Sequence, residues 1–399
     1  MSNLNFLEKL LDGVEVVWWP ISDVTKNTNN IKWQEATRGY QYIDLTSVSI
    51  DTKTIMETSE VTSSNAPSRA QKLVKKDDVL FATTRPTQMR YCLIDEEYNG
   101  AVASTGYCVL RVNKEVVLPK WILHLISSGE FKKYLEENQS GSAYPAISDA
   151  KVKEFKIPIP CPNNPEKSLA IQAEIVRILD AFTELTAELT AELNMRKKQY
   201  NYYREQLLNF EKSEVEWKTL GKIAENLDSK RKPITSGLRE AGDIPYYGAS
   251  GIVDYVKDYI FDGDYLLISE DGANLLARNT PIAFSISGKT WVNNHAHVLK
   301  FETYAERKYV EYYLNGIDLT PYISGAAQPK LNKKNLESIK IPNPSSKEKK
   351  RIVAILDKFD ALTCSIKEGF PREIELRQKQ YEYYRDLLLG FPKPEEAAA

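Results

Sequence analysis

Apolar side chains recur at three- and four-residue spacings in two stretches of the chain, a period typical of helices that pack on a partner. The first stretch runs from Ile175 to Leu207 and the second from Ile352 to Leu388. Because both carry a matching apolar seam, we expect two long helices that pack antiparallel as a coiled coil. Gly369-Phe370-Pro371 interrupts the second stretch. Since proline lacks the amide donor of a helix interior, we expect a kink and a fresh helical start there.

Two blocks outside these helices, roughly residues 14–157 and 214–341, carry short apolar runs bounded by Gly, Asn and Asp. Such runs predict strands joined by turns. The clearest lie at residues 79–83, 106–112 and 264–269, and each block also holds one short helical pattern, at 120–135 and 306–316. The chain therefore predicts an α+β protein with two mixed, strand-rich α/β domains separated by two long helices.

The chain also repeats itself at long range, which is sought before any local feature is interpreted. A loop at residues 140–147 and an Ile-Pro strand at 155–158 recur at 324–331 and 339–342. Both copies then enter a helix through Ile-Leu-Asp-x-Phe, and both helices end in Lys-Gln-Tyr-x-Tyr-Tyr-Arg. The segment around Trp18 resembles the segment around Trp217. The repeat is therefore a cyclic, pseudo-two-fold one, in which the N-terminal segment completes a unit that begins with the C-terminal helix.

Within the first helix, residues 186–193 read Thr-Ala-Glu-Leu twice in succession. Four residues make about one helical turn and bury nothing alone, so this repeat cannot fold by itself. We interpret it as a spacer. Its candidate spacer residues are Thr186, Leu189, Thr190 and Leu193.

These features together resemble the DNA-specificity subunits of type I restriction-modification systems, and in particular the subfamily whose spacer carries TAEL repeats. The resemblance rests on residues 186–193, the paired Lys-Gln-Tyr-x-Tyr-Tyr-Arg motifs and the cyclic duplication, and it covers essentially the whole chain. It implies a target-recognition domain at 1–157, a spacer helix with TAEL repeats at 158–213, a second recognition domain at 214–342, and a second spacer helix with a C-terminal tail at 343–399.

The same resemblance implies a function without catalysis in this chain. Each recognition domain would read one half of an asymmetric, split target in double-stranded DNA. The helices would set the gap and dock two modification (methyltransferase) subunits, and restriction (nuclease-translocase) subunits could join them. No cofactor is expected here, because S-adenosylmethionine, ATP and magnesium would be bound by the partner subunits.

Composition and charge are compatible with this interpretation without requiring it. Of 399 residues, 42% are apolar, which suffices for ordinary cores, and no run of about 18 apolar residues could cross a membrane. The N-terminus lacks the features of an export signal, and the four cysteines form no C-x-x-C pair, so we expect a cytoplasmic protein without a metal site. The net charge is −2, yet residues 66–92 and 330–351 are basic. Ordinary solvated surface would explain these basic stretches equally well.

Two polar loops are candidates for reading bases. Arginine pairs with guanine, asparagine or glutamine with adenine, and acidic side chains accept from cytosine in the major groove. The first polar loop, residues 83–90, offers Thr84, Arg85, Gln88 and Arg90. The second polar loop, residues 270–279, offers Glu270, Asp271, Asn274 and Arg278. Turns with solvated charge are the alternative for each residue, because most contacts to DNA go to its backbone.

The repeated loops at 140–147 and 324–331, here called the first and second duplicated loops, precede predicted helical turns beginning near Ser148 and Asn332. A helix N-terminus with nearby lysines suits a phosphate, although a purely structural turn explains the placement as well. The candidates are Ser142, Tyr144, Gln328, Lys330, Lys333 and Lys334.

A further pattern, Asn293-Asn294-His295-Ala296-His297, would place two histidines on one face of a strand. It lacks other metal ligands at a recognisable spacing. We therefore expect Asn294 and His295 to contact a base edge or to form a local turn.

Two rival functions remain. A self-sufficient DNA methyltransferase would show an Asn/Asp-Pro-Pro-aromatic motif and a glycine-rich loop, and the sequence has neither. Gly288-Lys289-Thr290 imitates the end of a phosphate loop, but residue 283 is Ala where that motif needs Gly. The other rival is a coiled-coil scaffold whose two domains bind protein rather than DNA.

Overall fold

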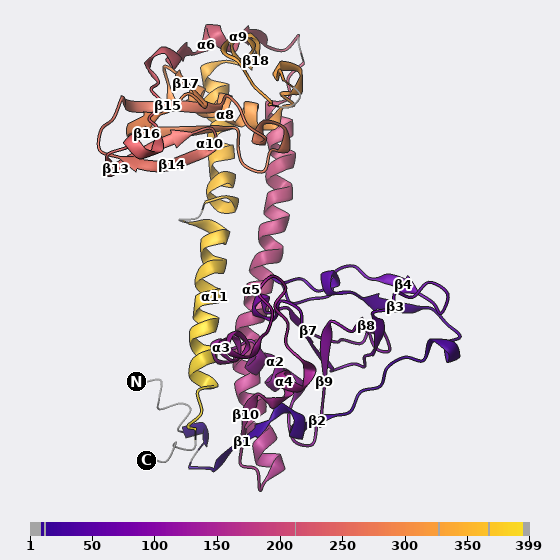
Figure 1. The fold of residues 1–399 in the computed structure, drawn as a ribbon. Helices are drawn as coiled ribbons and strands as arrows, with labels where there is room; N and C mark the ends of the chain where they lie inside the picture. The colour runs from indigo at the N-terminus through magenta and orange to yellow at the C-terminus, as the bar shows by residue number, and fades with distance from the viewer. Residues whose placement is uncertain (1–8, 12, 212, 326–327, 366–367, 394–399) are drawn as a thin grey trace. The chain divides into compact units, whose positions relative to one another are not determined.

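The computed structural model describes residues 9–11, 13–211, 213–325, 328–365 and 368–393. The chain divides into two compact units: unit 1 comprises residues 1–190 and 373–399, and unit 2 comprises residues 191–372. Both contain helices and a strand-rich part, as the expected α+β class requires (Figure 1). Among the described residues, no helix is long and apolar enough to cross a membrane.

Unit 1 is built around two four-stranded sheets and a two-stranded ribbon. The ribbon pairs β1 (Val16–Pro20) with β10 (Lys156–Pro160), and Trp18 lies opposite Pro158. One sheet has the order β2-β9-β6-β7 (Thr25–Lys26, Tyr107–Val112, Val79–Ala82, Tyr91–Leu93). The other has the order β4-β3-β8-β5 (Ser59–Val61, Tyr40–Ile43, Val102–Ser104, Ala70–Leu73). Helices α2 (Pro119–Ile126), α3 (Gly129–Asn138) and α4 (Asp149–Glu154) complete the unit's strand-rich part.

The core of unit 1 explains why its central strand is apolar throughout. All four residues of β6 are buried, because one face meets the helices and the other meets the second sheet. Trp121 of α2 is fully buried and donates its indole N–H to the carbonyl of Pro158, 3.2 Å away. The same core contains Ile175 and Leu179 from the first long helix together with Leu388 from the C-terminal helix. Segments distant in sequence therefore close one hydrophobic core.

Unit 2 repeats the ribbon and carries a larger sheet. The ribbon pairs β11 (Glu216–Thr219) with β18 (Lys340–Asn343), with Trp217 opposite Pro342. The six-stranded sheet has the order β12-β17-β15-β16-β13-β14 (Glu225–Asn226, Ala296–Lys300, Phe261–Ser269, Ala283–Val292, Ala241–Gly248, Gly251–Val256). Its helices are α6 (Leu220–Ile223), α7 (Asn274–Ala277), α8 (Tyr304–Gly316) and α9 (Lys333–Ser338).

The long helices confirm the cyclic repeat. Helix α5 (Pro165–Leu208) is 44 residues long and belongs to unit 1 through residue 190 and to unit 2 from residue 191. In unit 1, Phe182 of α5 stacks on Tyr384 of α11 (Gly369–Leu388), with ring centroids 5.3 Å apart. In unit 2, Phe359 of α10 (Ser346–Thr363) stacks on Tyr203 of α5 at 5.6 Å. Each unit thus combines the start of one repeated helix with the end of the other.

The aspartate two residues before each of these phenylalanines contacts a neighbouring helix of the same unit. In unit 1, His124 of α2 places Nε2 3.0 Å from Asp180 and Nδ1 3.0 Å from the Tyr381 hydroxyl. In unit 2, Tyr312 of α8 donates its hydroxyl to Asp357 at 2.6 Å. The aspartate is therefore common to both units, whereas the side chain that contacts it is a histidine in unit 1 and a tyrosine in unit 2.

One sequence expectation about helices is wrong in detail. Residues 120–135 form two helices, α2 and α3, where one was expected. The Ser128 side chain caps the second by accepting from the amide of Phe131, while the Ser127 hydroxyl donates to the carbonyl of His124. Two consecutive serines therefore end one helix and start the next, because their hydroxyls compete for backbone groups.

The expected interruption of the second long helix is confirmed. Helix α10 ends at Thr363 and α11 starts at Gly369, which has φ +75°. A Cβ at Gly369 would collide with the carbonyl oxygens of Ala361 and Leu362. Glycine is required here for both its conformation and its size.

We expect Gly369→Ala to lower the free energy of unfolding of the chain by at least about 1 kcal/mol, because alanine disfavours positive φ and meets backbone oxygen. Thermal unfolding of the purified variant would measure it. Gly237→Ala is the matched control, because a Cβ there meets nothing within 4 Å. Equal melting temperatures for the two variants would contradict this account of the junction.

Candidate nucleic-acid interface

The two polar loops are held by the two duplicated loops through the same backbone hydrogen bonds. In unit 1 the amide of Ile147 donates to the carbonyl of Thr83, at 2.9 Å. In unit 2 the amide of Leu331 donates to the carbonyl of Glu270, at 2.7 Å. These bonds place Thr83 and Glu270 at equivalent positions. They confirm that the first polar loop corresponds to the second.

A second pair of bonds fixes the next turn of each loop. The amide of Arg85 donates to the carbonyl of Pro145 at 2.7 Å, and the amide of Gly272 donates to the carbonyl of Pro329 at 3.3 Å. Isolated β-bridges between Thr84 and Ala146, and between Asp271 and Lys330, lie between these bonds and the first pair. Arg85 is therefore the structural equivalent of Gly272.

Both polar loops then make one short helical turn between two left-handed residues. In unit 1 the turn Pro86–Gln88 is bracketed by Arg85 (φ 49°) and Met89 (φ 52°). In unit 2, α7 lies between Gly272 (φ 102°) and Arg278 (φ 51°). A left-handed conformation costs a non-glycine residue roughly 1–2 kcal/mol. Such strain is often found at functional sites, and three of the six non-glycine residues with positive φ in the described part of the chain belong to these two turns.

The side chains of the first polar loop divide into outward and inward groups. Arg85 and Gln88 are exposed, and the Arg85 guanidinium lies 5.3 Å from the centre of the Tyr144 ring. Arg90 is half-buried and donates to the carbonyls of Leu45 and Val48. Arg90 therefore anchors the loop to the segment that follows β3. Thr84 is half-buried and Ser142 is exposed.

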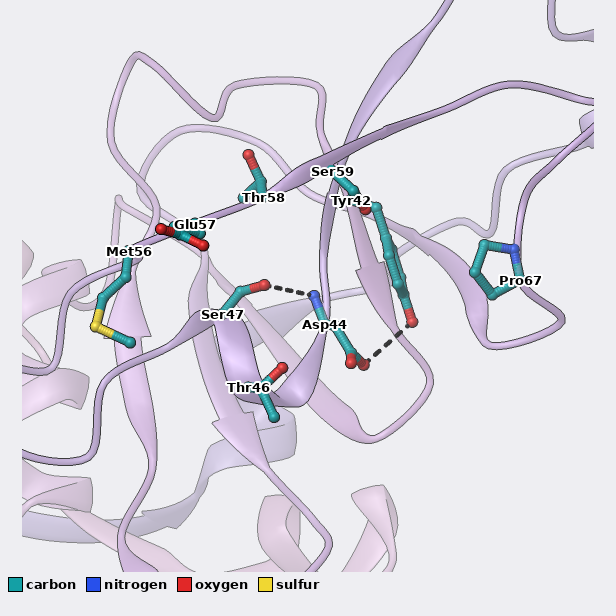
Figure 2. A pocket seen from close by; sticks show the side chains of 9 residues that line it. All are labelled: Tyr42, Asp44, Thr46, Ser47, Met56, Glu57, Thr58, Ser59 and Pro67. Atoms are coloured by element: carbon teal, nitrogen blue, oxygen red, sulfur yellow. Dashed lines mark hydrogen bonds between the residues drawn. The ribbon is translucent and has the colours of Figure 1, made fainter. Parts of the chain in front are cut away.

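That segment borders an open pocket of about 700 Å³ (Figure 2). The Tyr42 hydroxyl donates to Asp44 at 3.3 Å, and the amide of Asp44 donates to the Ser47 hydroxyl at 3.1 Å. The pocket is lined by Tyr42, Asp44, Thr46, Ser47, Met56, Glu57, Thr58, Ser59 and Pro67. With two carboxylates and no basic lining residue, it suits a hydrogen-bond donor better than a phosphate.

Glu270, in contrast, lies inside a network of charges. It is 9% exposed and accepts from Arg231 at 2.6 Å, and the Lys330 ammonium lies 3.1 Å from its other oxygen. Burial opposes ionisation of Glu270, but the Arg231 hydrogen bond and nearby positive charge hold its pKa below the ordinary value. Glu270 is therefore fully engaged within unit 2 and supports the loop.

His297 joins the same network, and here the sequence expectation needs correction. Strand β17 begins at Ala296, so only His297 lies in the strand, and it is buried. Its Nδ1 is 2.6 Å from Asp228 and its Nε2 is 2.7 Å from the carbonyl of Leu331. Each ring nitrogen of His297 therefore has an oxygen within hydrogen-bond distance.

Metal-ligand atoms of Asp228, Glu270 and His297 lie within 4.8 Å of one another. Sequence spacing did not reveal this group, because its members are distant along the chain. Arg231 lies 3.4 Å from Asp228 as well as 2.6 Å from Glu270. A cation would have to displace this guanidinium, and the His297 ring nitrogens are already occupied. The donor set therefore fits a closed ionic network better than a metal ion.

Outside this network, His295 reaches the surface. It lies in the turn before β17 with 51% of its side chain exposed, and its Nδ1 is 2.9 Å from Asp271. Because the Asp271 carboxylate accepts, Nδ1 carries the proton and Nε2 is left for another contact. The neighbouring Asn294 is also exposed.

The remaining candidates of the second polar loop support its backbone. The Asn274 amide group donates to the carbonyl of Thr280 and accepts from its amide, both at 3.0 Å. Arg278 donates to the carbonyl of Ile317 at 2.6 Å. Both side chains are thus used in shaping the loop.

The lysines beside the second duplicated loop lie at the start of α9. Asn332 caps this helix by accepting from the amide of Asn335 at 2.9 Å, as Ser148 caps α4 through the amide of Lys151 at 3.2 Å. Both predicted helical turns are confirmed. The residues exposed here are Gln328, Lys330, Lys333 and Lys334, of which Lys333 lies 3.7 Å from Glu337.

Comparison with known proteins agrees with the two-fold arrangement. The type I restriction modification DNA specificity domain matches twice, over residues 18–196 and 212–376. The chain belongs to the type I restriction-modification specificity family. The family model does not distinguish a TAEL-repeat subfamily. As a family member, the chain supplies DNA sequence specificity and is non-catalytic.

Alignments with two relatives cover nearly the whole length of this specificity chain. It is 40% identical to the EcoR124I/EcoR124II specificity subunit of Escherichia coli, with 99% of each chain covered. It is 36% identical to the EcoprrI specificity subunit of Escherichia coli, over 92% of this chain and 93% of that one.

Two solved structures share the fold. The first belongs to a study of complex assembly and conformational transition of a type I R-M system, with TM-score 0.63 and 21% identity, covering 94% of this chain and 97% of that one. The second is the S subunit from M. genitalium, with TM-score 0.58 and 18% identity, covering 96% and 97%.

The charged network generates a stability prediction. We expect Arg231→Met to lower the free energy of unfolding by roughly 3 kcal/mol or more, because it leaves Glu270 and Asp228 buried without their shared cation. Urea unfolding would measure the loss, with hydrogen exchange in β15 and β17 locating it. Lys232→Met, at an exposed neighbouring residue, should change stability by less than about 0.5 kcal/mol. A similar small loss in both variants would argue against the network.

The network also predicts acid sensitivity. Burial raises the pKa of Asp228, but the His297 hydrogen bond and charge outweigh it and hold this pKa below the ordinary value. Ionised Asp228 therefore stabilises unit 2 above about pH 4, and this contribution is lost as the pH falls further.

We expect the stability of Asp228→Asn to fall less steeply than that of the wild type between pH 5 and pH 3, about one unit on either side of an ordinary aspartate pKa. Denaturant titrations across this range would compare them. Asp243→Asn, which changes an exposed carboxylate in the same unit, should keep the wild-type slope. Parallel pH profiles for all three proteins would contradict the assignment.

Proposed function

We propose that the strand-rich parts of unit 1 and unit 2 are target-recognition domains that each read one half of an asymmetric bipartite site in double-stranded DNA. The observation that carries this proposal is the shared loop framework with different side chains. Equivalent backbone bonds hold Arg85 and Gly272, yet Arg85 presents an exposed guanidinium where Gly272 has no side chain. Two domains with one scaffold and unlike surfaces fit two unlike half-sites.

Within this proposal, exposed and half-buried side chains around the polar loops contact the DNA. Bases are read by Arg85, Gln88, Asp271, Asn294, His295 and Gln328, and Tyr144 lies beside Arg85. The lysines at 330, 333 and 334, with Ser142 and Thr84 in the first domain, contact phosphates. Arg90, Glu270, Asn274 and Arg278 are assigned to support, because their polar groups are occupied by the protein.

The TAEL repeats are proposed to act as a ruler. Helix α5 continues through them, and the hydroxyls of Thr186 and Thr190 donate to the carbonyls of Phe182 and Thr186. Each four-residue repeat adds about 6 Å of helix and about 40° of rotation. One base pair adds about 3.4 Å and about 35°. Rotation must match for a domain to face the groove, so one repeat corresponds to one unread base pair.

The partners in this proposal are two modification subunits docked on the helices and restriction subunits that join them. Catalysis then belongs to these partners, which bind S-adenosylmethionine, ATP and magnesium. The names of the relatives, which are specificity subunits of restriction enzymes, support this division of labour.

The decisive experiment is sequencing of methylated genomic DNA from cells that carry this chain with its modification subunits. We expect one bipartite motif with two different halves and a fixed gap. Gel-shift titrations should show binding that prefers this motif and weakens with salt. Indifference to DNA in the assembled complex would favour a protein-binding scaffold, and methyl transfer by the chain alone would favour an enzyme.

Deletion of residues 190–193 tests the ruler. We expect both half-sites to stay the same while the gap shortens by one base pair, because the helix loses about 40° of rotation. The methylated motif of cells carrying the deletion would show it. Thr190→Ala keeps the helix length and should keep the gap. An unchanged gap in the deletion variant would refute the ruler.

A further inference from the structure

Arg85 occupies the position in unit 1 that Gly272 occupies in unit 2. The amides of Arg85 and Gly272 make the same bond to a proline carbonyl of the duplicated loop, and both residues have positive φ. Glycine adopts this conformation without strain, whereas arginine does so at a cost. The backbone does not need arginine at this corner, so its side chain calls for a functional explanation.

A contact with an aromatic ring orients the Arg85 side chain. Its guanidinium lies over the ring of Tyr144, which is 71% exposed and precedes the proline that accepts from the Arg85 amide. Within the described part of the chain, this guanidinium has no hydrogen-bond or ion-pair partner. A ring face restricts the orientation of the guanidinium while leaving its N–H groups available.

The second domain carries a different pair at the same place. Gln328 precedes Pro329 as Tyr144 precedes Pro145, and Gly272 replaces Arg85. The corner where polar loop meets duplicated loop is therefore chemically distinct in the two domains on an otherwise shared backbone. A position of this kind is suited to setting which base each domain accepts.

We propose that Arg85 and Tyr144 form the specificity-determining pair of the first domain, in which Arg85 donates to N7 and O6 of a guanine and Tyr144 is a positioning residue. Guanine offers two acceptors in the major groove that match the arginine fork. This inference rests on the proposed function and adds the base class and the residues that select it. The second domain, without this arginine, reads its half-site by other groups.

Arg85→Gly tests the proposal without threatening the fold, because glycine suits the left-handed corner. We expect the variant complex to be at least as thermally stable as the wild type. Its discrimination at one guanine in one half-site should fall by about ten- to a hundredfold. Binding of the full complex to duplexes with single base-pair changes in either half would measure it, and the other half-site is the internal control.

Conservative variants separate the roles of the two residues. Arg85→Lys keeps the charge but loses the two-pronged donor. Its discrimination at that guanine should be as low as that of Arg85→Gly, while its overall affinity for DNA should be higher than that of Arg85→Gly. Tyr144→Phe keeps the ring face and should retain the wild-type preference, whereas Tyr144→Ala should lose part of it at the same base pair.

Arg38→Gln is the matched control. Arg38 is also exposed, and its guanidinium also lies over a tyrosine ring, that of Tyr40, at 4.3 Å. It lies beside Gly100, which precedes strand β8, whereas the first polar loop contacts Gly106, which follows that strand. This variant should read both halves normally.

Three results would overturn the inference. One is unchanged discrimination in Arg85→Gly at every base pair of both halves. Another is equal weakening on all sequences with a smaller salt dependence, which would identify a phosphate contact. The third is loss of discrimination in both halves together. Failure of the proposed function is distinct, because the wild-type complex itself would then show no bipartite preference.

Discussion

The stacking of a phenylalanine from one helix on a tyrosine from another closes each unit of this protein. Phe182 meets Tyr384 in unit 1, and Phe359 meets Tyr203 in unit 2. Unit 1 is built from two stretches of chain, whereas unit 2 is continuous in sequence, and in both units apolar surface at the start of one helix is covered by the end of another. Burial of that surface is the main stabilising contribution. Helix α5 consequently contributes to two cores, and the TAEL repeats lie between these two contributions.

The second constraint is that the loops are fixed by backbone atoms. Amide-to-carbonyl bonds from the duplicated loops hold the polar loops at Thr83 and Arg85 in one unit and at Glu270 and Gly272 in the other. Backbone hydrogen bonds of this kind do not depend on which side chains the bonded residues carry. A loop held in this way keeps its shape while its outward chemistry diverges, which suits the two unlike half-sites that we propose.

Side chains that point inward show the opposite behaviour. Unit 2 places a carboxylate at Glu270 and must then compensate it with Arg231 and Lys330, while His297 is tied to Asp228 and to the duplicated loop. Buried charges are tolerated only when they are paired and hydrogen-bonded. This network joins the strand end, the second polar loop and the second duplicated loop. In unit 1, Thr83 needs only the carbonyl of Gly106.

The sequence by itself determined the α+β class, the long helices with an interruption and a fresh start near Gly369, the cyclic repeat and the two polar loops, because periodicity and duplication are properties of the order of residues. It also located α8 and the helical turns after the duplicated loops. Only the tertiary structure decided which candidates face outward. Arg85 and Arg90 are five positions apart in one basic loop, yet one guanidinium is exposed and the other is bound to Leu45 and Val48. Asp228, Glu270 and His297 meet through strand pairing across about seventy residues of sequence, and no local spacing encodes that encounter.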